Sequence, residues 1–193
     1  MKSIGNVVIF TAPSGAGKTT IVQHLLKRYG RLGFSISATT RAKRPHEKEG
    51  VDYYFMNVQQ FLEHIELGDF LEWEEVYPGK YYGTFQSEVQ RIWDDGKHIV
   101  FDVDVKGATS IKQHYGENAM AVFIKPPSLQ VLIDRLKNRR TETKKALKQR
   151  IERVKNELTY EHRFDKILVN DILEVTLKEA ELLVEDFLNW NES

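Results

Sequence analysis

The residues with the clearest chemical potential form a glycine-rich segment near the N-terminus. It reads Ala12, Pro13, Ser14, Gly15, Ala16, Gly17, Lys18, Thr19, with Thr20 next. Gly15 and Gly17 allow backbone N–H groups to turn inward and surround an anion. Lys18 is placed to reach the β- and γ-phosphates of a nucleoside triphosphate, and the Thr19 hydroxyl to ligate Mg²⁺. The pattern predicts a phosphate-binding P-loop in which Ala12 replaces the usual first glycine.

The residues on either side are those that a P-loop requires. The run 7–10 is β-branched and aromatic, which is typical of a buried strand. Residues 19–29 carry apolar side chains at helical spacing, and Gly30 suits the end of a helix. Thr20 is grouped with the ATP-binding residues but is expected on the helix surface rather than on the metal. The alternative, a glycine-rich turn without a ligand, is disfavoured because Gly-Lys-Thr stands at the helix start.

Two arginines, Arg41 and Arg44, provide a second set of groups suited to phosphate. Each guanidinium offers paired donors and a charge that does not titrate. Both belong to a charged stretch, 41–49, and such a stretch alone is more often a solvated loop. Their spacing therefore leaves both interpretations open.

Composition places the chain among ordinary globular proteins. Its 193 residues suffice for one domain with a core, and 41% apolar and 29% charged residues argue against disorder. The 28 basic and 28 acidic residues cancel, which does not indicate bulk binding to nucleic acid or membranes. There is no cysteine, so disulfides and thiolate metal sites are excluded. With no apolar stretch of spanning length, the sequence predicts a cytoplasmic protein.

Strand-like and helical segments alternate along most of the chain. Strands are expected at 7–10, 98–103, 120–124 and 166–170, and helices at 19–29, 107–114, 129–159 (helix, turn, helix) and 173–190. Between 34 and 97, short strand-like segments and two short helices indicate an α+β insertion with exposed loops. The alternation predicts an α/β fold with a mostly parallel sheet and helices on both faces.

Several further blocks follow one another along the chain. They are 12–20, 34–44, Gly50-Val51-Asp52-Tyr53, Phe70-Leu71-Glu72-Trp73, Tyr81-Tyr82-Gly83-Thr84, 102–107, 139–143 and 169–171. Through these blocks the sequence resembles a guanylate kinase over essentially its whole length. The resemblance implies a P-loop NTPase core with a parallel sheet flanked by helices, an α+β GMP-binding insertion and a helical lid. A single domain, 1–193, is expected, with its core at 1–34, 98–125 and 160–193, the insertion at 35–97 and the lid at 126–159.

The resemblance also implies which residues bind GMP. The phosphate would be held by Ser37, Arg41, Arg44, Tyr53 and Tyr82, and the guanine read by Glu72, Thr84 and Asp104. A carboxylate such as Glu72 can accept the N1–H and N2–H of guanine together, whereas adenine has no such donor pair. Without the surrounding blocks, Glu72 would be an ordinary strand-surface carboxylate, and the two tyrosines would pack on a strand.

Asp102 and Asp104 flank Val103 on a predicted strand, and a regular strand directs them to opposite faces. Asp102 would then face the P-loop and hold Mg²⁺ with Thr19, through water, while Asp104 faces the guanine. An irregular strand end would remove this division. One of the two carboxylates could instead cap the next helix.

The charged segment 129–153 is, for most of its residues, simply a solvated helical hairpin. Its resemblance to the family lid singles out Arg135, Arg139 and Arg150, which would close over the triphosphate. With Lys18 and Arg41, these residues form the expected catalytic set.

Three further positions near the site are less regular. Arg140 stands where the family usually has glycine, and Lys106 where glutamine is common. Asn170, followed by Asp171, occupies the position that contacts the adenine of ATP in the family, although Asn-Asp is also a routine turn.

The function implied by the resemblance is transfer of a phosphoryl group from ATP to GMP, giving ADP and GDP in purine nucleotide metabolism. Mg²⁺ is the expected cofactor, ATP and GMP are the expected partners, and dGMP is a further expected acceptor. No nucleic-acid or membrane partner is expected, and monomer or homo-oligomer is left open. No general base is needed, because the acceptor phosphate is largely ionised at neutral pH and the reaction depends on alignment and charge neutralisation.

Three other functions compete with this one. A guanylate-kinase-like interaction module would have lost catalysis and would bind a phosphorylated peptide, but such modules have degenerate P-loops. A P-loop GTPase would carry an Asn-Lys-x-Asp guanine-reading motif, which does not occur in this sequence. A kinase for another nucleoside monophosphate would not depend on Glu72.

Overall fold

The computed structural model describes residues 5–137 and 144–190. They form two compact units. Unit 1 contains Gly5 and Arg31–Ile99, and unit 2 contains Asn6–Gly30 and the described part of Val100–Ser193. The expected insertion falls within unit 1 and the expected lid within unit 2. The grouping of core, insertion and lid into a single domain stays a prediction.

A five-stranded sheet forms the centre of the α/β arrangement. Its order is β2 (Leu32–Phe34), β7 (His98–Asp102), β1 (Val7–Thr11), β8 (Ala119–Lys125) and β9 (Lys166–Val169). β8 pairs in parallel with β1 on one side and with β9 on the other. Every residue of β1 is buried, as expected of a central strand covered on both faces.

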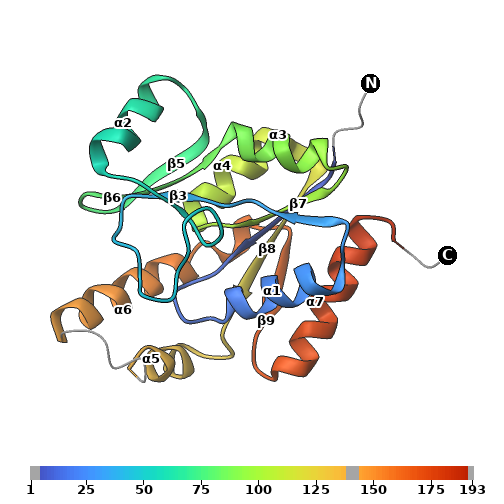
Figure 1. The fold of residues 1–193 in the computed structure, drawn as a ribbon. Helices are drawn as coiled ribbons and strands as arrows, with labels where there is room; N and C mark the ends of the chain where they lie inside the picture. Colours follow the sequence, from blue (N-terminus) through green and yellow to red (C-terminus); the bar gives the residue numbers. More distant parts are fainter. Residues whose placement is uncertain (1–4, 138–143, 191–193) are drawn as a thin grey trace. The chain divides into compact units, whose positions relative to one another are not determined.

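The helices of unit 2 follow these strands and flank them. They are α1 (Lys18–Arg28), α4 (Val105–Tyr115), α5 (Leu129–Lys137), α6 (Lys144–Leu158) and α7 (Leu173–Phe187). α1 and α7 pack against each other, α4 packs on β1 and β8, and α5 contacts α6 (Figure 1). His24 of α1 lies 2.6 Å from Glu181 of α7, so a polar pair joins these two helices. The predicted α/β fold is confirmed.

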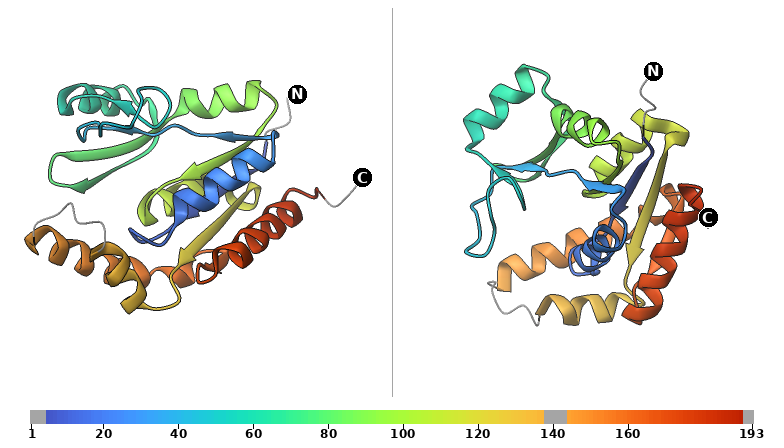
Figure 2. Two further views of the ribbon diagram at one scale, coloured as in Figure 1. Left: turned by 60° about the horizontal axis from the view of Figure 1, so that its bottom comes forward. Right: turned by 45° about the vertical axis from the view of Figure 1, so that its right-hand side comes forward.

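Unit 1 is built on a separate mixed sheet. Its order is β4 (Tyr54–Phe55), β3 (Ala38–Thr39), β6 (Lys80–Phe85) and β5 (Phe70–Tyr77). β5 and β6 form a long antiparallel hairpin, and β3 is antiparallel to β6 but parallel to β4 (Figure 2). The helices α2 (Val58–Glu66) and α3 (Gln86–Asp94) complete the unit.

The two faces of this sheet differ in chemistry because side chains alternate along each strand. One face is apolar, with Ala38, Phe61 and Phe70 in a buried cluster. Gly83 on this face leaves no room for a side chain, since a Cβ would lie 3.0 Å from the Glu72 carbonyl and 3.1 Å from the Phe61 ring. The opposite face, called the acceptor face below, carries Glu72, Tyr82 and Thr84.

Some element boundaries differ from the predicted ones. β5 continues to Tyr77, four residues beyond the sequence block Phe70–Trp73, because it pairs with β6 along the hairpin. β7 ends at Asp102 rather than at Val103, and α4 begins at Val105. β2 and β3 are too short to leave a periodic pattern in the sequence. Among the described residues, no helix has the length and apolar character needed to cross a membrane.

Candidate active site

The glycine-rich segment connects β1 to α1 in unit 2. Gly15 and Gly17 have φ values of 92° and 97°, which residues with a Cβ rarely adopt. Gly17 is the N-cap of α1, with no side-chain hydrogen bond to the helix start and no acidic residue in the first turn. The first N–H groups of α1 therefore point to a region suited to an anion.

Lys18 extends from the first turn of α1 to the end of β7. Its Nζ lies 2.6 Å from Asp102 Oδ1 and donates a hydrogen bond of 2.7 Å to the Val103 carbonyl. The structure thus brings together the predicted phosphate-binding lysine and the predicted metal-binding carboxylate. Thr19 and Thr20 are both exposed on α1.

Asn170, at the end of β9, holds the P-loop from within the protein. Its Nδ2 donates to the Ala16 carbonyl at 2.7 Å, and its side chain is buried. A Cβ on Gly17 would lie only 2.2 Å from the same nitrogen, so glycine is required there for packing as well as for its φ. The amide nitrogen of Asn170 is engaged with the loop, and its predicted adenine contact stays a prediction.

Two of the three predicted lid arginines lie in described helices. Arg135 on α5 donates from Nη2 to the Asn170 carbonyl at 3.3 Å, next to the P-loop. Arg150 lies on α6. The predicted catalytic residue Arg139, and Arg140 with it, lie outside the described residues.

Asp104 is the N-cap of α4, so its predicted place on a regular strand is wrong. Its Oδ1 accepts the Gly107 N–H at 2.9 Å, and its Oδ2 accepts from Arg153 Nη2 at 3.2 Å. Arg153 also donates to Glu157 Oε1 at 2.6 Å. The strand ends early because Asp104 satisfies a helix N–H that would otherwise lack a partner. The sequence leaves helix capping open as an alternative role, and Asp104 has that role in the structure.

The predicted guanine-reading residues of unit 1 meet on the acceptor face. Glu72 and Thr84 are opposite each other on β5 and β6, and Thr84 Oγ1 donates to Glu72 Oε1 at 2.7 Å. Thr84 is fully buried, so this bond restrains the carboxylate without a competing water. Tyr82 lies two residues from Thr84 and shares its face.

The predicted phosphate-binding residues gather near Tyr82. The Tyr53 and Tyr82 rings are 6.1 Å apart between centroids, and the Arg41 guanidinium carbon lies 4.8 Å from the Tyr53 centroid. Ser37 is buried, and its carbonyl accepts the Tyr54 N–H at 3.0 Å. Arg44 is the outlier, with a side chain that is 60% exposed.

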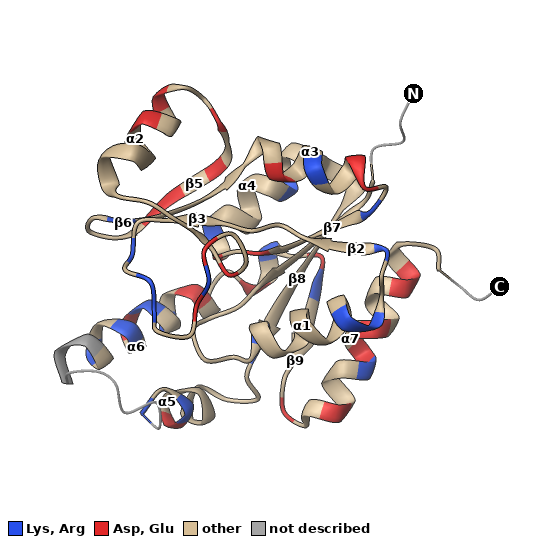
Figure 3. Cartoon of the chain, viewed as in Figure 1, with Lys and Arg blue, Asp and Glu red and all other residues tan. Residues whose placement is uncertain are grey.

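Glu47 belongs to this cluster, although no sequence pattern predicts a role for it. It lies in the loop between β3 and β4, which carries both basic and acidic residues (Figure 3). Its carboxylate pairs with Arg41, and its residue surface is 7% exposed. The only signal in the sequence is a glutamate six positions after Arg41, within a stretch that otherwise resembles a solvated loop.

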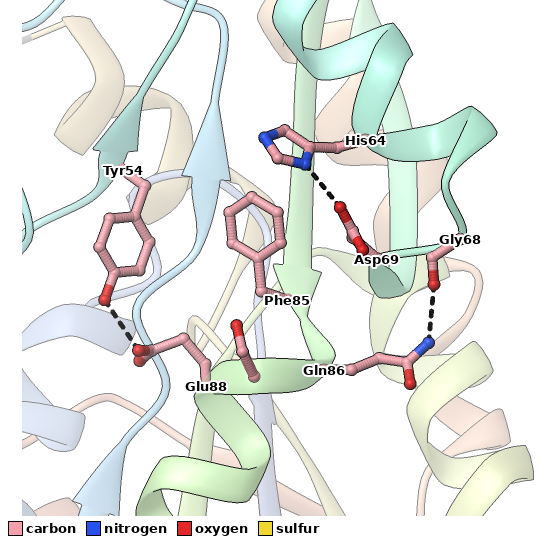
Figure 4. A pocket seen from close by; sticks show the side chains of 8 residues that line it. Tyr54, His64, Gly68, Asp69, Phe85, Gln86 and Glu88 are labelled. Atoms are coloured by element: carbon pink, nitrogen blue, oxygen red, sulfur yellow. Dashed lines mark hydrogen bonds and ion pairs between the residues drawn. The ribbon is translucent and has the colours of Figure 1, made fainter.

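A cavity of about 470 Å³ lies in unit 1 beside β4, β6 and α3, lined in part by Tyr54, His64, Asp69 and Glu88 (Figure 4). Its ionisable side chains are engaged in pairs with one another. His64 lies 2.7 Å from Asp69, and Tyr54 Oη donates to Glu88 Oε1 at 2.8 Å. The cavity therefore presents paired groups rather than groups waiting for a ligand.

Glu88 also connects the segments that carry the phosphate-binding residues. Its Oε2 accepts the Ile36 N–H at 3.1 Å, next to Ser37, and its Oε1 holds Tyr54, next to Tyr53. Burial raises the pKa of the Glu88 carboxyl. Hydrogen bonds from Arg91, Tyr54 and Ile36 outweigh burial, so its pKa is lower than usual.

Glu88→Gln is expected to destabilise unit 1 by about 1–3 kcal/mol at neutral pH, because three donors lose their anionic acceptor at a buried position. A lowered pKa stabilises the fold above the unfolded pKa, and this contribution is lost as pH falls through the folded value. The difference between wild type and variant should thus shrink below about pH 4.5. Urea unfolding at several pH values measures it, with exposed Glu66→Gln as the control. An equal difference at pH 7 and pH 3 would contradict the assignment.

Comparison with known proteins decides among the remaining interpretations. A family model described as guanylate kinase matches residues 4–187. The chain belongs to the guanylate kinase family. The guanylate kinase of Porphyromonas gingivalis is 45% identical, over 94% of this chain and 97% of the relative. That of Salinibacter ruber is also 45% identical, over 95% of this chain and 97% of the relative.

Solved structures agree with this family. The crystal structure of guanylate kinase from Anaplasma phagocytophilum matches with a TM-score of 0.74 and 26% identity, over 95% of this chain and 86% of that one. A shikimate kinase from Bacteroides thetaiotaomicron, at 13% identity and a TM-score of 0.50, shares the fold alone. The predictions of the guanylate kinase family, its α/β fold and a kinase that phosphorylates GMP to GDP are confirmed. The family uses ATP.

Proposed function

We propose that this chain transfers the γ-phosphoryl group of ATP to GMP, with unit 2 binding the donor and the acceptor face of unit 1 binding GMP. The hydrogen bond between Thr84 and Glu72 is the observation that carries this proposal. It fixes one carboxylate on a sheet face that also presents Tyr82, next to Tyr53 and Arg41. A carboxylate that can bind a base and a group of phosphate-binding side chains, both on one sheet face, suit a nucleoside monophosphate.

The acceptor chemistry follows from these groups. Thr84 donates its hydroxyl proton to Glu72 and has no exposed surface, so it contributes to base reading by orienting the Glu72 carboxylate. The Glu72 carboxylate can accept the N1–H and N2–H of guanine. Adenine would place an unprotonated nitrogen against the same carboxylate, so the site disfavours AMP. Ser37, Arg41, Arg44, Tyr53 and Tyr82 hold the phosphate in this proposal.

The donor chemistry belongs to the P-loop. Backbone N–H groups between Gly15 and Thr19 cradle the phosphates, and Lys18 neutralises charge that develops on the transferred group. Mg²⁺ prefers oxygen ligands, and Thr19 and Asp102 offer a hydroxyl and a carboxylate, so the donor set fits this ion. When held there by Thr19 and Asp102, Mg²⁺ would supply positive charge that neutralises the phosphates. Arg135, Arg139 and Arg150 would add positive charge from the lid. A location in the cytoplasm stays a prediction.

A coupled assay of ADP release tests this proposal across GMP, dGMP, AMP, CMP, UMP and dTMP. GMP is expected to be used at least about 100-fold more efficiently in kcat/KM than AMP or the pyrimidine nucleotides, since only guanine satisfies the carboxylate. Chelation of Mg²⁺ should abolish turnover, and added Mg²⁺ should restore it. Absence of GMP-dependent ADP release would contradict the proposal, and so would equal use of AMP.

A further inference from the structure

Glu47 is a buried acidic group inside a basic loop, in unit 1. Its Oε2 accepts from Arg41 Nη1 at 2.7 Å and its Oε1 from Arg41 Nη2 at 2.5 Å. The same Oε2 accepts the backbone N–H of Arg44 at 2.8 Å. One carboxylate therefore holds the side chain of one phosphate-binding arginine and the backbone of the other.

Arg41 uses only part of its hydrogen-bonding capacity on Glu47 and Ala42. A guanidinium has five N–H groups, and three are engaged: two with Glu47 and one, from Nη1, with the Ala42 carbonyl at 3.0 Å. The remaining two, on Nε and Nη2, have no hydrogen-bond partner among the described residues. These two lie along one edge of the planar group, and such an edge matches two oxygens of a phosphate.

We propose that Glu47 is a positioning residue for the acceptor phosphate: it grips one edge of Arg41 so that the Nε–Nη2 edge is presented to GMP. The inference rests on the proposed role of Arg41 in binding the GMP phosphate. The aromatic rings support the same orientation from a second side. The Arg41 guanidinium carbon lies 4.8 Å from the Tyr53 centroid and 5.6 Å from that of Phe55, which restricts rotation of the guanidinium plane.

The negative charge of Glu47 allows a positioning role to be distinguished from a purely electrostatic one. Hydrogen bonds from Arg41 lower the pKa of Glu47 to about 2, so the carboxylate is ionised at neutral pH. It places a negative charge beside a site for an anion. If Glu47 acted on GMP through charge alone, its removal would tighten GMP binding. If it positions Arg41, its removal will weaken GMP binding, so the two roles predict changes of opposite sign.

Steady-state kinetics of Glu47→Gln, an isosteric change, distinguishes the two. We expect KM for GMP to rise about 10-fold or more, because Arg41 loses its oriented edge, with KM for ATP changed less than 2-fold. Glu47→Asp, which keeps the charge, should recover part of the loss. Glu66→Gln on α2 is the matched control for glutamate removal, since Glu66 is exposed. A melting temperature for each variant shows whether the fold is retained.

A double-mutant cycle with Arg41→Lys separates positioning from general stability. In the Arg41→Lys background there is no fork to orient, so Glu47→Gln should add less than 2-fold to KM for GMP. Independent, multiplicative effects would overturn the proposal, as would a fall or no change in KM for GMP in Glu47→Gln alone. If wild type does not convert GMP, the proposed function fails instead, and if Arg41→Lys leaves KM for GMP unchanged, the proposed role of Arg41 in binding the GMP phosphate fails.

Discussion

Lys18→Met is expected to lower kcat by about 10³-fold, because the reaction gains most of its rate from charge neutralisation on the transferred phosphoryl group. The Lys18 ammonium is the cation that the structure places at the start of α1, 2.6 Å from Asp102. A fixed charge that is lost from the transition state appears in kcat rather than in KM for GMP.

The measurement needs a control for the lost ion pair. Asp102 loses its partner in Lys18→Met, but its side chain is 21% exposed, so water can solvate it and the fold should persist. Lys27→Met, in the exposed last turn of the same helix, should leave kcat within 2-fold. A Lys18→Met enzyme that is folded and retains more than a tenth of wild-type kcat would remove Lys18 from the proposed mechanism.

Glu72→Gln is expected to reduce kcat/KM for GMP by about 10²–10³-fold. The amide keeps one uncharged acceptor and places its NH₂ donor against a donor of guanine, so one charge-assisted hydrogen bond is weakened and the other is lost. Thr84 loses its anionic partner as well, which loosens the acceptor face. KM for ATP should be unaffected, because the P-loop is unchanged.

Inosine monophosphate, which lacks the 2-amino group of guanine, reports on the same contact. Wild type should prefer GMP over IMP by one to two powers of ten, about the value of one hydrogen bond to a charged group. The preference should shrink in Glu72→Gln. Glu75→Gln is the matched control, since Glu75 is exposed on the same strand and keeps an acceptor for the Gly79 N–H. Equal GMP/IMP ratios in wild type and Glu72→Gln would show that Glu72 does not read the base.

The donor half of the site follows closely from the sequence, because its geometry is local. A strand, two glycines with positive φ and a helix start occur within 22 consecutive residues, from Val7 to Arg28, and neighbouring positions dictate each conformation. Asn170 is different. Its contact with Ala16 joins residues 154 positions apart, so no local pattern indicates that its amide holds the loop.

The acceptor half depends more on tertiary pairing. Glu72 and Thr84 were predicted from family resemblance, but their hydrogen bond results from the register of β5 against β6. The role of Glu88 is harder to predict, because it lies on a polar helix and its burial depends on contacts with Ile36 and with Tyr54 of β4. The sequence leaves Asp104 open between a strand position and a helix cap, and its hydrogen bond from the Gly107 N–H shows that it caps α4.

The P-loop, the alternation of strands and helices, and the family blocks can all be read from the chain itself, because each depends on residues that are neighbours in sequence. Which carboxylates pair with which donors is decided by the fold. Asp102 pairs with Lys18, Asp104 caps α4, and Glu47 engages Arg41. Packing is the physical reason: a charged side chain in a loop is solvated by default, and only the tertiary structure brings a partner to it and reduces its contact with water.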